Sequence, residues 1–307
     1  MKGAGGLPSV PRSLGRVPFS TRRRLSAVLF AGALAAGGCT AEQPGTATAP
    51  ASAAPSSTHT PQPREPASPT PPAKPAPAPE VGDCRNLTAA AITAPTDATE
   101  PVRCTRPHTA QTLDVGRIPR RVVGDRAEPD PRAIADYVTP RCERRFVRWI
   151  GGDRETRILS RLHAVWFLPS EDDLALGARW FRCDAIAFGT GDEPALLPRD
   201  VQGVLSDPGA LDVFGVCSRG SPEEVDSVLV MCDRRHNWRA FDVLPVQPGR
   251  KDRYPSAESR RDARGSCRDA SREELGYPLE WHYGWQRPSR RAWTNGVRHG
   301  LCWVPSN

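Results

Sequence analysis

The fold is decided by a stretch that occurs twice, reading HAVWFLPSEDDLALGARWFRC at residues 163–183 and HYGWQRPSRRAWTNGVRHGLC at residues 282–302. The two copies share seven residues at identical spacing, His-x2-Trp-x2-Pro-Ser-x6-Gly-x-Arg-x3-Cys. A second shared block, Cys-x3-His-x5-Asp-Val, begins at Cys104 and again at Cys232. Such self-similarity indicates that one structural unit is present twice. We therefore expect two tandem modules, at residues 82–190 and 211–307, joined by a connector at 191–210.

The first 38 residues have the composition of an export signal. A basic segment that includes Arg22, Arg23 and Arg24 precedes an apolar run at 25–36 and small residues directly before Cys39. The apolar run is too short for a bilayer-spanning helix, which needs roughly 20 residues. The segment resembles a bacterial lipoprotein signal, which implies that Cys39 is diacylated and anchors the protein at the extracytoplasmic face of the cell membrane. A plain signal peptide, and export by the twin-arginine route, are the alternatives.

The charge balance of the rest of the chain argues against nucleic-acid binding. Six of the 42 Lys and Arg residues lie in the first 38 residues, so the remainder carries 36 basic and 35 acidic residues. The sequence pI of about 9.1 therefore reflects the signal and not a basic surface. Residues 39–81 begin with Cys39 and continue as a Pro-, Ala- and Thr-rich tract, which we expect to be a disordered spacer.

Eight of the nine cysteines remain when Cys39 is set aside for the lipid, and they fall four to a module in the same order. An even, duplicated set in an exported chain favours disulfides, and no Cys-x-x-Cys is present to suggest a zinc ribbon or a redox motif. Three pairings per module are possible. We favour pairing the first with the second and the third with the fourth cysteine, giving Cys84–Cys104, Cys142–Cys183, Cys217–Cys232 and Cys267–Cys302.

Apolar periodicity predicts a helix at 131–150 in the first module, and the second module is expected to repeat the order with a strongly charged helix at 256–275, each surrounded by short strands. The strands are expected at 100–104, 109–118, 159–168 and 178–188 in the first module, and at 211–218, 227–232, 240–246, 279–286 and 297–304 in the second. This order predicts an α+β fold with mainly antiparallel sheets. The segments 171–176 and 290–295, one acidic and one basic, are expected to be loops that recognise different partners.

Four histidines occupy equivalent positions in the two modules: His108, His163, His236 and His282. One hypothesis is a metal or acid–base site in each module, joining His108, His163 and Asp114 in the first. The other, which we favour, is a structural role beside the disulfides. No catalytic motif is recognisable, so we expect neither catalytic residues nor a cofactor or bound metal, and regard a hydrolase or metal-dependent enzyme acting on the cell wall as the alternative.

Several short motifs of the first module resemble the septum-formation domain family of actinobacterial exported proteins. They are Gly82-Asp83-Cys84, Cys104-Thr-Arg-Pro-His108, Trp166-Phe-Leu-Pro169 and the stretch from Gly177 to Cys183. The second module resembles a degenerate copy, with Phe214-Gly-Val-Cys217 in place of Gly-Asp-Cys. The resemblance implies an envelope location and a link to septation, without an active site. We therefore expect a non-catalytic binding or scaffold module whose partner is an envelope protein or a wall component.

Overall fold

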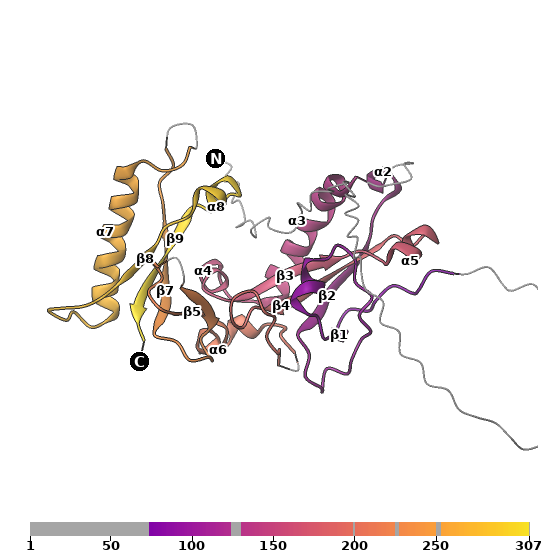
Figure 1. Cartoon of the computed structure of the whole chain (residues 1–307), viewed down its shortest axis with the longest axis horizontal. Helices are drawn as coiled ribbons and strands as arrows, with labels where there is room; N and C mark the ends of the chain where they lie inside the picture. Colours follow the sequence, from indigo (N-terminus) through magenta and orange to yellow (C-terminus); the bar gives the residue numbers. More distant parts are fainter. Residues whose placement is uncertain (1–73, 124–129, 199, 225–226, 250–252, 307) are drawn as a thin grey trace, which may run out of the picture. The chain divides into compact units, whose positions relative to one another are not determined.

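A computed structural model describes residues 74–123, 130–198, 200–224, 227–249 and 253–306 (Figure 1). The predicted export signal, Cys39 and most of the predicted spacer lie outside the described residues. The described chain is α+β, as predicted, and contains two antiparallel sheets of four and five strands.

The first sheet has the strand order β1-β2-β4-β3. Its strands are β1 (Cys84–Arg85), β2 (Ala110–Arg117), β3 (Leu162–Phe167) and β4 (Trp180–Ala187). Short helices punctuate the connections: α1 (Ala89–Thr93), α2 (Arg120–Val123), α4 (Arg154–Ile158) and α5 (Glu171–Ala175).

One long helix, α3 (Pro131–Ile150), covers one face of this sheet, as the sequence predicts. Asp130 caps its first turn, because its side chain accepts a hydrogen bond from the Arg132 N–H, and Pro131 needs no such partner. Gly151, at φ 78°, ends the helix in a backbone conformation that glycine adopts readily. The buried side of α3 packs on residues of β2 and β4, whereas the opposite face of the sheet is covered by the segment around α1.

The second sheet has the order β6-β5-β7-β9-β8, with α7 (Ala257–Glu274) packed along it (Figure 1). Its strands are β5 (Val216–Arg219), β6 (Val228–Met231), β7 (Trp238–Pro245), β8 (Gly284–Gln286) and β9 (His299–Pro305). The short helices are α6 (Ala210–Phe214) and α8 (Arg290–Thr294). A 3-10 turn at Val204–Ser206 precedes α6.

The two sheets repeat one another strand by strand, since β5-β7-β9-β8 follows the order of β1-β2-β4-β3 and β6 is an added edge strand. The register repeats as well: Trp166 lies opposite Cys183, and Trp285 lies opposite Cys302. Even the irregularities coincide. The pairing of β2 with β4 shifts just before Asp114, and that of β7 with β9 shifts just before Asp242. The Asp of the repeated block therefore marks a β-bulge.

Four disulfides join the cysteines in the order that the sequence favours, namely Cys84–Cys104, Cys142–Cys183, Cys217–Cys232 and Cys267–Cys302. Their Cα–Cα distances are 5.0–5.5 Å, within the usual range for a bridge. The second bridge of each module ties the long helix to the central strand that carries the last cysteine. These bridges indicate an oxidising, extracytoplasmic compartment.

Both predicted loops between Ser and Gly are wrong, because they form the helices α5 and α8. The serine of the repeated Pro-Ser pair is an N-cap: Ser170 accepts from the Asp173 N–H and Ser289 from the Ala292 N–H. Each helix then ends before a glycine at positive φ, Gly177 at 95° and Gly296 at 92°. The repeated residues thus encode a helical turn between two strands.

Other predicted boundaries also differ. The strand expected at 100–104 is reduced to a single bridge at Val102, and the one expected at 211–218 is split by Gly215 into α6 and β5. The strand expected at 279–286 is confined to β8. The connector at 191–210 is more than a linker, because Ala195, Leu197 and other apolar residues of it are buried in the core of the first module.

Removing a bridge should destabilise the protein according to the loop that the bridge closes. The Cys142–Cys183 bridge spans 41 residues and Cys217–Cys232 spans 15. Chain-entropy arguments give losses of about 4 and about 3 kcal/mol for the double alanine variants. Urea unfolding of both variants would measure the difference, and a larger loss for the shorter loop would contradict this explanation.

Candidate functional site

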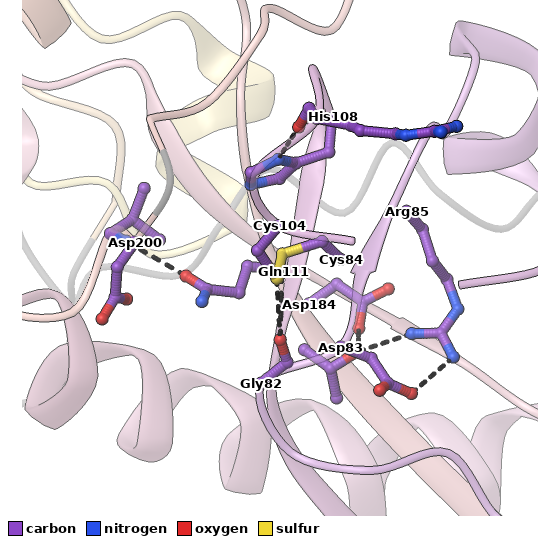
Figure 2. The surroundings of a disulfide bond; sticks show 12 residues. Gly82, Asp83, Cys84, Arg85, Cys104, His108, Gln111, Asp184 and Asp200 are labelled. Atoms are coloured by element: carbon purple, nitrogen blue, oxygen red, sulfur yellow. Dashed lines mark hydrogen bonds and ion pairs between the residues drawn. A yellow bond between two sulfur atoms is a disulfide. The ribbon is translucent and has the colours of Figure 1, made fainter. Parts of the chain in front are cut away.

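The histidines of the first module are placed by the fold in separate environments. His108 is buried beside the Cys84–Cys104 bridge, with Nδ1 2.9 Å from the Arg106 carbonyl oxygen (Figure 2). His163 projects from β3 and packs on the Phe188 ring, with ring centroids 5.1 Å apart. Burial and the nearby Arg161 charge lower the pKa of His163 to about 4. The rings of His108 and His163 therefore each pack against neighbouring residues of the fold, as side chains with a structural role do.

The histidines of the second module are equally separate. His236 repeats the geometry of His108, with Nδ1 2.7 Å from the Arg234 carbonyl oxygen, and its Nε2 lies 2.8 Å from the Ser306 hydroxyl. His282 is exposed in the segment before β8. His108 and His236 are thus the repeated pair with the same local hydrogen bond, between Nδ1 and the carbonyl oxygen two residues earlier.

The hypothesis of a metal or acid–base site that joins His108, His163 and Asp114 is not supported. Asp114 pairs with Arg145 of α3 at 3.1 Å. Within the part of the chain that the structure describes, no group of three or more His, Cys, Asp or Glu side chains is arranged to hold a metal ion.

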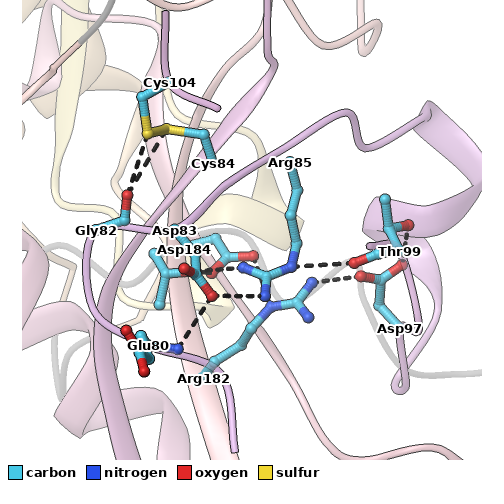
Figure 3. A network of polar contacts seen from close by, with 11 residues as sticks. Glu80, Gly82, Asp83, Cys84, Arg85, Asp97, Thr99, Cys104, Arg182 and Asp184 are labelled. Atoms are coloured by element: carbon cyan, nitrogen blue, oxygen red, sulfur yellow. Dashed lines mark hydrogen bonds and ion pairs between the residues drawn. A yellow bond between two sulfur atoms is a disulfide. The ribbon is translucent and has the colours of Figure 1, made fainter. Parts of the chain in front are cut away.

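The structure instead brings together a buried set of charged residues that the sequence analysis missed (Figure 3). Arg182 and Asp184 project from β4 on the face away from α3 and are 1% and 0% exposed. Arg85 of β1 and Thr112 of β2 lie on the same face, since Arg85 contacts Thr112 and Thr112 contacts Asp184. The loop after α1 adds Asp97. The position of Asp97 in this loop shows that the network ties the loop to the sheet.

Hydrogen bonds connect these side chains into one chain of contacts, which we call the arginine–aspartate network. The Arg85 guanidinium donates to Asp83 at 3.0 Å and to the Thr112 hydroxyl at 2.9 Å. That hydroxyl donates to Asp184 at 2.8 Å. Arg182 then donates to Asp184 at 2.9 Å and to Asp97. Each guanidinium is therefore held by two oxygen-bearing side chains.

Burial gives the network its energetic character. Removing charges from water costs several kcal/mol per ion unless geometry and additional hydrogen bonds compensate. Burial raises the pKa of Asp184, against the opposing effects of Arg182 and of the Thr112 hydrogen bond. The Arg182 guanidinium also lies 4.6 Å from the centroid of the Phe167 ring. Because its carboxylates are all engaged by cations, the network is suited to fixing structure.

The second module has an apolar interior at the same positions. The repeat places Leu301 where the first module has Arg182, and Trp303 where it has Asp184. Trp303 is fully buried in a cluster with Ala240, Val216 and other apolar residues. Equivalent strand positions therefore hold the charged side chains Arg182 and Asp184 in the first module, and Leu301 and Trp303 in the second.

A family model described as septum formation matches residues 81–302, which include all four disulfides and both sheets up to Cys302 in β9. The chain belongs to the septum formation family. Neither a curated protein nor a solved structure matches the chain. Among the described residues, no helix is both long and apolar enough to cross a membrane.

The Gly-Asp-Cys motif by which the chain resembles the septum formation family has a structural explanation here. Gly82 adopts φ 94°, which glycine tolerates, and its N–H donates to the Thr112 carbonyl at 2.8 Å. Asp83 accepts from Arg85, and Cys84 forms the first disulfide. The motif thus contains the first residue of β1, a carboxylate of the arginine–aspartate network and a cysteine of the first disulfide.

A sequence signal for the network does exist. In the β4 stretch Trp-Phe-Arg-Cys-Asp-Ala-Ile-Ala, Arg182 and Asp184 are the charged residues of an otherwise apolar strand, and they alternate around Cys183. Charges two apart in a strand share a face. A charged pair on one face of a buried strand predicts an ionic partner across the sheet.

Replacing Arg182 by the residue of the second module, R182L, should lower the free energy of unfolding by about 3–5 kcal/mol, because Asp97 and Asp184 would be left buried without their cation. The matched control is R268L, since Arg268 forms an exposed pair with Asp269 and such pairs contribute about 0–1 kcal/mol. Urea unfolding at neutral pH compares the two, and equal losses would argue against the network.

Acid should destabilise the fold through His163. The folded-state pKa of about 4 lies below the unfolded value of 6.5, so the unfolded chain binds the proton first. The contribution of neutral His163 to the free energy of unfolding is fully present above pH 6.5. It is lost as the pH falls toward 4, and the loss is at most about 3 kcal/mol. In H163Q the unfolding free energy should fall less steeply over this window. A slope equal to that of the unmutated protein would exclude His163 as the cause.

Proposed function

We propose that this protein is a lipid-anchored component of the cell envelope that acts in septum formation by binding a partner, without catalysing a reaction. Family membership supports the link to septation, and the four disulfides support an extracytoplasmic location. The resemblance of residues 1–39 to a lipoprotein signal supports the anchor. The family domain, in this proposal, is an internal duplication with a diverged second copy.

The observation that carries the proposal is the division between shared and different residues. The shared cysteines, serines and aspartates serve the fold: they form bridges, cap α5 and α8, or follow the bulges. The residues that differ include exposed surface charges, as α5 begins with Glu171, Asp172 and Asp173 whereas α8 begins with Arg290 and Arg291. Divergence of surface charge on one fold is what binding of different partners requires.

A direct comparison separates binding from catalysis. The purified protein is incubated with peptidoglycan fragments and with solubilised envelope extract, and products are followed by mass spectrometry. The proposal expects saturable association without turnover. Turnover that is lost in H108Q or H236Q would instead favour the wall-acting enzyme that uses the repeated histidines.

The anchor gives the first cellular prediction. In C39S the diacylation site is removed, so the protein should leave the membrane fraction, because the two acyl chains supply the stable attachment. Cell fractionation and metabolic labelling with a fatty acid measure both effects.

A tagged protein with Cys39 intact should concentrate at division septa. Uniform distribution in dividing cells would contradict the septal role while leaving the anchor in place.

A further inference from the structure

A pocket opens at the end of the second sheet where β5 and β9 end and β7 begins. Its lining includes Arg219, Arg235, His236 and Ser306. A third arginine of the pocket, Arg234, pairs with Asp233 at 3.3 Å, so the positive charge of Arg219 and Arg235 is not balanced by an acid of the pocket. The pocket therefore favours an anionic ligand.

The first module shows what this part of the fold can hold. There the end of β4 and the turn before β2 are covered by the connector, which runs in an extended form. The Ala195 N–H donates to the Ala187 carbonyl at 2.8 Å, and the Leu197 N–H donates to the His108 carbonyl at 2.8 Å. Donors two residues apart point to the same side of an extended chain. The first module thus binds a peptide segment of its own chain here.

The repeat places the corresponding acceptors in the pocket. Ser306 corresponds to Ala187 and His236 to His108, in the same register of strand pairing. Within the described residues, no backbone N–H donates to the carbonyl of either residue. The side chains of the two are hydrogen-bonded to each other at 2.8 Å. Among the described residues, the two carbonyls that correspond to the acceptors of the first module therefore have no backbone donor.

We propose that this pocket binds an extended acidic peptide of a partner protein, in the manner that the connector occupies the first module. Two backbone N–H groups of the peptide donate to the carbonyl oxygens of Ser306 and His236, so that the peptide lies across the ends of the neighbouring strands β9 and β7. An acidic side chain of the peptide meets Arg219 and Arg235, which can bind a carboxylate through paired N–H donors. The inference deepens the proposed binding function and rests on it.

The connector supplies a probe of the required chemistry, because residues 192–198 read DEPALLP and combine two acids with the extended segment. A fluorescent peptide of this sequence is titrated into the purified full chain, with fluorescence anisotropy as the readout. The matched control is the same peptide N-methylated at the positions of Ala195 and Leu197, which removes the two donors. Saturable binding that weakens at least tenfold on methylation is expected. Equal binding of the two peptides, or no binding at millimolar concentration, would overturn the proposal.

Protein variants separate this pocket from other surfaces. R219E/R235E should weaken binding of the unmethylated peptide at least tenfold. R120E/R121E, which makes the same charge change on exposed residues of α2, should leave it within twofold. Equal weakening by both variants would show general charge attraction and overturn the pocket. Septal localisation of the tagged protein is scored separately, so that failure of the peptide site is distinguishable from failure of the septal role.

Discussion

The covalent tie between the long helix and the central strand is the constraint on which each module depends. Cys142 and Cys267 lie at buried positions of α3 and α7, and each bridge ends on the strand whose neighbour contains the bulge. The bridge fixes which face of the helix meets the sheet. The bulge then sets which residues of the central strands face the helix, since a shift of one residue exchanges the two faces of a strand.

With this frame fixed, the opposite face of the sheet can be filled in two ways. The first module holds the arginine–aspartate network, and the second holds Trp303 and its apolar neighbours. Buried ion networks are often no more stabilising than well-packed apolar groups, but they demand complete satisfaction of each charge. In the first module that demand fixes the loop containing Asp97, through its ion pair with Arg182.

Much of the architecture follows from the sequence because it rests on periodicity and on cysteine order. The helix 131–150 has a cap, an initial proline and a terminal glycine pair, so its limits are encoded locally. The helices α5 and α8 were predicted as loops because a single turn is too short to show helical periodicity, although Ser170 and Ser289 are recognisable caps. The network could not be assembled from sequence, since Asp97 and Arg182 are 85 residues apart and meet through strand order. The pocket at His236 likewise depends on residues from the ends of β5 and β9 and the start of β7, which meet through strand order and not through a local pattern.

The disulfides also determine how the protein would respond to mechanical load. Under the proposed function the protein is held at one end by a membrane and at the other by a division partner, and would be pulled as the envelope is remodelled. The four bridges enclose loops of 20, 41, 15 and 35 residues. Those loops cannot lengthen unless the bridges are reduced. At about 3.4 Å per residue, the bridges prevent roughly 370 Å of chain from being extended. The bridged loops contain roughly half of the residues of the two modules, so the bridges would about halve the length to which the folded part can be extended.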